Sequence, residues 1–130
     1  MKLKIITHNR TIYDGPADEI QITGVGGALG ILPGRQPITT PLAIGVTKAV
    51  INGTLHYYAT MGGVFQFSDD NAVILTNACE AENDIDVKRA EESKARAEER
   101  LAKAEIQTDI SRAEMALARA MTRLKAVKHE

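Results

Sequence analysis

The segment NDIDVKRA, residues 83–90, marks the point at which the composition of this 130-residue chain changes. All ten glycines and all four prolines lie before Val64, whereas the residues after Ile85 are rich in Ala, Glu, Lys and Arg. Glycine and proline mark turns, and the second set consists of strong helix formers. We therefore expect a turn-rich domain at residues 1–84 and a helical segment at residues 85–130.

Before this border, apolar and polar residues alternate. Residues 2–5 (KLKI) and 19–22 (EIQI) have the period of two that is typical of half-buried strands. Asn52-Gly53 lies between two β-prone runs and predicts a two-residue hairpin turn, and a longer polar turn is expected at residues 69–71. Strands at this spacing predict an all-β sandwich or barrel, closed so that few strand edges remain.

The aromatic and sulfur-containing side chains of the first part are expected to belong to its core. Tyr57, Tyr58 and Phe65 lie in the run HYYATMGGVF and are most simply explained by core and cross-strand packing. Cys79 is the single cysteine and cannot form an internal disulfide. We expect it to be a small buried residue in a protein of a reducing compartment.

After Ile85, the spacing of apolar residues becomes that of a helix. One stripe runs from Val87 to Ala104 and a second from Ile110 to Val127, and both are narrow and rich in alanine. Small residues let two helices approach closely. The fold class expected is α+β, with an N-terminal all-β sandwich followed by a C-terminal antiparallel two-helix hairpin that leans on it.

Capping residues are present near both helix starts. Asp84 or Asp86 is expected to cap the first helix and Thr108 or Asp109 the second, and basic residues complement the dipole of the last turn. The connecting segment EIQTDIS, residues 105–111, has no Gly or Pro and specifies a turn only weakly. Our hypothesis is that the helices can swing away and join into one longer helix, with a gap of roughly a few kcal/mol.

The two helical segments repeat each other, since RAEESKARAEER at residues 89–100 resembles RAEMALARAMTR at residues 112–123. The spacing aligns arginines on one face of each helix. For Arg96 and Arg100, nearby Glu92 and Glu99 favour simple charge neutralisation.

The second arginine stripe has fewer carboxylates close in sequence. Arg119 and Arg123 stand among apolar and small residues, and Asp86 and Arg89 lie at i,i+3 on the first helix. Unpaired guanidinium groups facing that helix would form a small cationic cleft suited to phosphates. Contact with an acidic partner protein explains the same residues equally well.

Several functional classes find no support in the sequence. The run GVGGALG lacks the third glycine of a dinucleotide-binding loop, because Leu29 stands there, and no spacing of His, Ser, Cys or carboxylates suggests a catalytic triad or a metal site. The two parts carry net charges of −3 and +2, and this small imbalance does not call for nucleic acid. The lack of catalytic motifs indicates that the chain is not an enzyme. No signal peptide or membrane span is expected at the N-terminus, so the chain is expected to be soluble.

Three separated motifs, LGILPGRQPITTPL (29–42), MGGVF (61–65) and IDVKRA (85–90), together resemble the epsilon subunit of bacterial F-type ATP synthases. The resemblance runs the whole length of the chain. It implies a non-catalytic rotor subunit of the central stalk that binds the gamma subunit and the c-ring. It also implies that the helices inhibit ATP hydrolysis when they extend towards the catalytic alpha and beta subunits, and that the chain lies peripherally on the cytoplasmic face of the plasma membrane.

The border segment gains a specific interpretation from this resemblance. IDVKRA is similar to a motif with which some of these subunits bind ATP in the folded hairpin. The resemblance implies ATP as a regulatory ligand and no obligatory cofactor. It does not say whether ATP binding requires magnesium. The residues it places at the ATP site are Glu80, Ile85, Asp86, Arg89, Ala90, Arg119 and Arg123.

Two positions depart from the resemblance. Ala28 stands where many relatives carry glutamate, and Arg35 stands where histidine is common, so contacts with the ring or stalk there are not implied. Three interpretations remain: a rotor subunit with a helical brake, a small-molecule sensor that binds ATP, and a structural adaptor whose basic helix face recognises an acidic protein.

Overall fold

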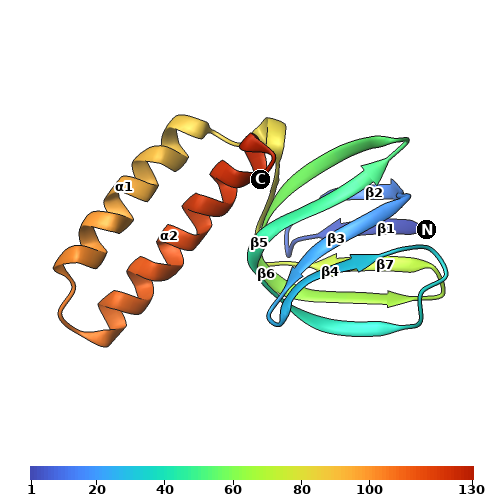
Figure 1. Ribbon diagram of the computed structural model, residues 1–130, viewed down its shortest axis with the longest axis horizontal. Helices are drawn as coiled ribbons and strands as arrows, with labels where there is room; N and C mark the ends of the chain where they lie inside the picture. The colour runs from blue at the N-terminus through green and yellow to red at the C-terminus, as the bar shows by residue number, and fades with distance from the viewer.

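The computed structural model describes residues 1–130 and consists of a β-sandwich with a helical hairpin attached to one side (Figure 1). This architecture confirms the predicted α+β fold class. The elements in chain order are β1 (Lys2–Ile6), β2 (Thr11–Pro16), β3 (Glu19–Gly24), β4 (Gly27–Ile31), β5 (Ile38–Ile51), β6 (Thr54–Ser68), β7 (Asn71–Leu75), β8 (Cys79–Ala81), a short 3-10 helix η1 (Glu82–Asp84), α1 (Val87–Lys103) and α2 (Gln107–Lys128).

The sheet has the strand order β2-β1-β7-β6-β5-β3-β4, and β8 pairs with β6 off this path. All pairs are antiparallel except β1 with β7. The expectation of a closed sheet is wrong, because β2 and β4 end the path and do not pair with each other. Both edge strands are short, which limits the unpaired backbone that they expose.

The alternating residues of the first part form the core as predicted. Leu3, Ile5, Ile20 and Ile22 are fully buried, and the polar residues between them are exposed. Burial raises the pKa of the Cys79 thiol to about 11, so at neutral pH this residue is the inert, buried thiol that its sequence context predicted.

Turn residues set the register of the long strands. Asn52 and Gly53 both have positive φ and join β5 to β6 in the predicted two-residue turn. Asp69 and Asp70 also have positive φ and join β6 to β7, so the longer turn expected at residues 69–71 is in fact equally short. Asp70 is held there because its carboxylate accepts the Gly34 N–H at 3.0 Å.

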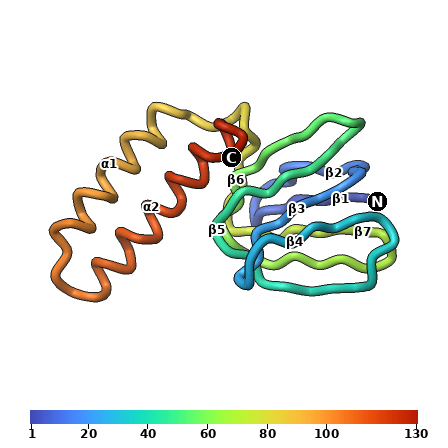
Figure 2. The backbone as a smooth tube through the Cα atoms, in the orientation of Figure 1, coloured from blue at the N-terminus to red at the C-terminus, as the bar shows by residue number.

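The hairpin lies beside the sandwich and contacts it mainly through the end of α2 (Figures 1 and 2). Asp86 caps α1 as predicted, since its side chain accepts the Arg89 backbone N–H at 3.0 Å. The predicted caps of α2 are wrong: the N-cap residue is Ile106, which makes no side-chain cap bond, and Thr108 and Asp109 lie inside the first turn.

Alanines form the seam between the helices, as the stripes predicted. Ala90 and Ala97 of α1 and Ala113 and Ala120 of α2 are all nearly inaccessible to solvent. No helix of the chain has both the length and the apolar character needed to span a membrane.

The position of Gly63 in β6 requires glycine, and this requirement can be tested. It has φ +116°, and a Cβ at this position would lie 2.0 Å from the Leu75 carbonyl oxygen of the neighbouring strand. We expect Gly63→Ala to lower the free energy of unfolding by about 2 kcal/mol or more, measured in urea. Gly30→Ala is the control, because a Cβ there meets no atom within 4 Å. Equal stability of the two variants would contradict this role for Gly63.

Candidate functional site

A pocket of about 310 Å³ lies where the sandwich, α1 and α2 meet. β8 and η1 contribute one wall, the first turns of α1 a second, and the last turns of α2 the third. The lining residues are Glu80, Asp84, Asp86, Arg89, Ala90, Ser93 and Arg123.

Asp86 and Arg89 occupy the first turn of α1 at the mouth of this pocket. One carboxylate oxygen of Asp86 caps the helix through the Arg89 N–H, so the local backbone fixes the carboxylate in place. The Arg89 guanidinium is exposed and forms no ion pair. This pair therefore offers a positioned acceptor and a free forked donor beside the pocket.

Arg123 does not have the free guanidinium group that its sequence neighbours predicted. Its Nε lies 2.5 Å from Glu80 Oε1, and both side chains are about 70% shielded from solvent. The lining then carries three carboxylates and two guanidinium groups, an excess of one negative charge. The expectation of a cationic cleft is therefore wrong for this pocket, because Glu80 and Asp84 add two carboxylates to that of Asp86.

The structure brings together five of the seven predicted site residues, which are Glu80, Asp86, Arg89, Ala90 and Arg123. It does not place the other two in the lining. Ile85 is buried against the apolar residues between sandwich and hairpin, and Arg119 is half-buried on α2 one turn before Arg123. Binding of ATP by this set stays a prediction.

The C-terminal end of α2 is fixed to the sandwich by a second contact, which we call the C-terminal clasp: Tyr57, Glu82 and His129. The imidazole ring stacks on the Tyr57 ring with centroids 4.2 Å apart and an interplanar angle of 4°. The same imidazole bonds the Glu82 carboxylate through Nε2. His129 has the left-handed conformation of a helix C-cap, which directs its ring back onto β6.

An apolar cluster lies under the clasp. Tyr57, Ala59 and Met61 of β6 pack with Ile85 and Ala126. Tyr58 and Cys79 lie on the opposite side of the sheet in the main core, where burial raises the pKa of Tyr58 to about 12. Residues 57–61 of β6 are consequently buried on both faces.

Sequence reasoning missed Asp84 and Ser93 as lining residues, and it missed the clasp. The unbroken run YYATM was the available signal, because a half-exposed strand would alternate with polar residues. Nothing local could reveal the bond between His129 and Glu82, which are 47 positions apart.

Both parts of the chain match models of known protein families. Residues 1–82 match the family "ATP synthase, Delta/Epsilon chain, beta-sandwich domain", and residues 83–128 match the "long alpha-helix domain" of the same chain. The chain belongs to the ATP synthase delta/epsilon family. The two matches meet close to the border at which the composition of the sequence changes.

Curated relatives in this family are bacterial epsilon chains. The chain is 43% identical over 125 residues to the ATP synthase epsilon chain of Pelotomaculum thermopropionicum, covering 96% of this chain and 93% of the relative. It is 37% identical over 104 residues to that of Halalkalibacterium halodurans, covering 80% and 78%. These relatives confirm the predicted resemblance to an epsilon subunit, and with it a non-catalytic subunit of ATP synthase.

Chains in two solved ATP synthase assemblies share the fold. A chain of the Euglena gracilis mitochondrial ATP synthase, in a structure of OSCP, F1 and c-ring, superposes with a TM-score of 0.84 at 22% identity, covering 98% of this chain and 80% of that one. A chain from the Tetrahymena thermophila central stalk and c-ring gives 0.63 at 13% identity, covering 97% and 95%. At these identities the likeness extends to the fold alone.

The clasp can be tested by local hydrogen exchange. We expect His129→Ala to speed amide exchange in the last two turns of α2 roughly thirtyfold, because a ring stack and a hydrogen bond are each worth about 1 kcal/mol. Exchange in the sandwich core should not change. Lys128→Ala, one residue away and outside the clasp, is the control; if it speeds exchange equally, the clasp does not hold α2.

Proposed function

We propose that the chain is a central-stalk subunit that couples rotation of the c-ring to ATP synthesis. In this proposal the sandwich, residues 1–84, binds the gamma subunit and the c-ring, at the cytoplasmic face of the plasma membrane. The bacterial epsilon chains related to it support the proposal, as does its fold, which occurs in a structure described as a central stalk and c-ring. The unpaired backbone of β2 and β4 leaves strand edges on the sandwich for neighbouring subunits.

We also infer that the hairpin, residues 85–130, is a mobile brake that inhibits ATP hydrolysis by extending towards the catalytic alpha and beta subunits. The observation that carries this proposal is the attachment of the hairpin by one end. Its contacts with the sandwich, all made by the last turns of α2 and by His129, are the C-terminal clasp, the Arg123–Glu80 pair, the small apolar cluster around Ala126, and packing on β5 beside that cluster. Few contacts therefore need to break for the helices to leave.

The connection between the helices supports the same transition. Ala104 and Ile106 end α1 and begin α2 with extended backbone angles, and neither is a glycine or proline. Both residues accept helical angles, so changes at residues 104–106 suffice to join α1 and α2. The missing side-chain cap at the start of α2 means that little is lost when the turn disappears.

ATP is the ligand proposed for the pocket at the base of the hairpin. Its walls come from β8, η1, α1 and α2, so the complete pocket exists only in the folded state. Any ligand that needs all the walls stabilises this state by its differential affinity. The carboxylates suit the exocyclic amine and ribose hydroxyls of a nucleotide, while its phosphates would compete with Glu80 for Arg123.

The brake is tested by cross-linking the hairpin closed. The variant chain carries Cys79→Ala and one engineered cysteine on each of α1 and α2, placed so that a disulfide bridges the helices. This chain would be reconstituted with the catalytic head. We expect oxidation to raise ATP hydrolysis several-fold, because the helices cannot extend, and reduction of the same sample to restore inhibition. A chain that ends at Asp84 gives the uninhibited rate. Equal rates for oxidised, reduced and shortened chains would overturn the brake.

ATP binding is tested on the isolated full chain. We expect Arg89→Ala to weaken ATP binding at least tenfold in calorimetric titration, with and without magnesium, because a forked donor to the ligand is lost. The matched control is Lys88→Ala, which removes the neighbouring positive charge outside the pocket. Unchanged binding by Arg89→Ala, or no binding by the unmodified chain, would exclude this site.

A further inference from the structure

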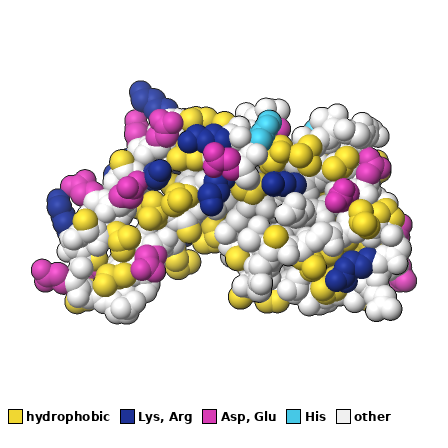
Figure 3. Space-filling view, in the orientation of Figure 1, with side chains coloured by type: hydrophobic (Ala, Val, Ile, Leu, Met, Phe, Trp, Pro, Cys, Tyr) yellow, Lys and Arg dark blue, Asp and Glu magenta, His cyan; other side chains and the backbone are white.

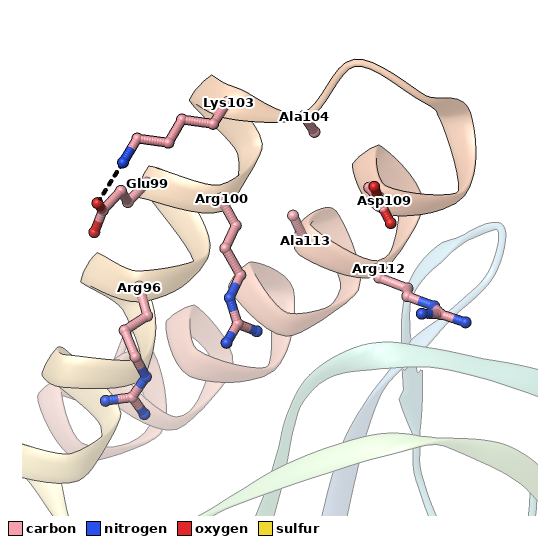
Figure 4. Close-up of a pocket in the computed structure, with 8 residues that line it drawn as sticks. All are labelled: Arg96, Glu99, Arg100, Lys103, Ala104, Asp109, Arg112 and Ala113. Atoms are coloured by element: carbon pink, nitrogen blue, oxygen red, sulfur yellow. Dashed lines mark hydrogen bonds and ion pairs between the residues drawn. The ribbon is translucent and has the colours of Figure 1, made fainter.

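A second and larger pocket, of about 580 Å³, lies towards the far end of the hairpin, away from the sandwich (Figures 1 and 4). The end of α1 and the start of α2 form it. Its lining residues are Arg96, Glu99, Arg100, Lys103, Ala104, Asp109, Arg112 and Ala113.

The carboxylates of this region do not neutralise its arginines as the sequence led us to expect. Glu99 pairs with Lys103 at 2.8 Å, and Figure 4 shows this lysine turned towards it. Arg96 instead donates to the Ser93 hydroxyl at 3.1 Å. Arg100 and Arg112 form no ion pair at all.

The charge of this pocket is opposite to that of the pocket at the base. Four cationic and two acidic side chains line it, which leaves an excess of two positive charges. On the visible face of the molecule, positive and negative side chains are otherwise mixed over the hairpin (Figure 3). The uncompensated positive charge at the far end of the hairpin is thus carried by Arg100 and Arg112, which line the same pocket, and Figure 4 shows the Arg112 side chain turned away from Arg100.

Folding of the hairpin creates this concentration. Arg96 and Arg100 share one face of α1, and Figure 4 shows both side chains extending the same way, with Arg112 contributed by α2. In one continuous helix, residues 100 and 112 would be separated by roughly 18 Å along the axis. Closure places both arginines in the lining of one pocket, where a single anion can be reached by both side chains, so such an anion favours the folded state.

We propose that the pocket between Arg100 and Arg112 binds inorganic phosphate or diphosphate and thereby stabilises the folded hairpin. Guanidinium groups supply paired N–H donors that match phosphate oxygens, and exposed arginines without partners can reorient towards such a ligand. This anion pocket shares no lining residue with the pocket at the base, although Arg96 of the one donates to Ser93 of the other. The proposal therefore stands whether or not ATP binds near Asp86.

The test is a titration of the full chain with sodium diphosphate at constant ionic strength, followed by backbone amide NMR. We expect saturable shifts confined to residues 96–113, and a dissociation constant raised at least tenfold in the double variant Arg100→Ala/Arg112→Ala. These exposed helix positions tolerate alanine, which has the highest helix propensity. Arg100→Gln/Arg112→Gln repeats the test with the side-chain length largely kept.

A charge-matched control separates the site from the general attraction of anions. Lys88→Ala/Lys128→Ala removes the same two charges from exposed positions outside the pocket and should bind diphosphate like the unmodified chain. Shifts that do not saturate, or equal weakening by both double variants, would overturn the proposal. Asp86→Ala should retain diphosphate binding even if it loses ATP, so the two sites fail independently.

Discussion

The packing of the last turns of α2 on β6 is the contact on which the arrangement of this molecule depends. Ala126 lies against Tyr57, Ala59 and Met61, and its small side chain lets the helix approach the sheet closely. The carboxylates of Glu80 and Glu82 then fix Arg123 and His129 on either side of this contact. Without it, α1 and α2 would keep only their alanine seam and the covalent link at Asp86.

Strand β6 of the sandwich forms the surface on which α2 packs. β6 is the longest strand and is buried on both faces from Tyr57 to Met61, so adjacent tyrosines serve different layers: Tyr58 the main core and Tyr57 the hairpin. Gly62 and Gly63, both with positive φ, lie where the partner of β6 changes from β8 to β7. The same strand therefore packs in the main core and against the base of the hairpin. The far end of the hairpin has no contact with the sandwich.

Local physics made much of the fold predictable. The alternation around Leu3 and Ile20, the Asn52-Gly53 turn and the Asp86 cap are decided by neighbours in sequence, and all three were predicted correctly. The open edges of β2 and β4 were missed, because strand order depends on pairings that composition does not encode. The cap of α2 was misassigned because Thr108 and Asp109 are suitable residues, but the helix begins earlier, at Gln107.

The candidate site shows the same division. Asp86, Arg89 and Ala90 are close in sequence, and their grouping followed from helix geometry. The charge of the pocket did not, since Glu80 reaches Arg123 across 43 positions and reverses the expected sign. Glu99 pairs with Lys103 four residues later and leaves Arg100 uncompensated, because side chains at i,i+4 face each other on a helix and those of adjacent residues do not.

The central claim, that the hairpin is a weakly attached two-state element, is tested most directly by a distance across its base. Spin labels at positions 87 and 121, both partly exposed, would be measured by pulsed EPR in a Cys79→Ala background, with the chain alone and assembled with the catalytic head. We expect two populations: a short distance favoured by ATP, and one near 50 Å, since 34 residues of continuous helix span about 51 Å. A single short distance in every condition would contradict the claim.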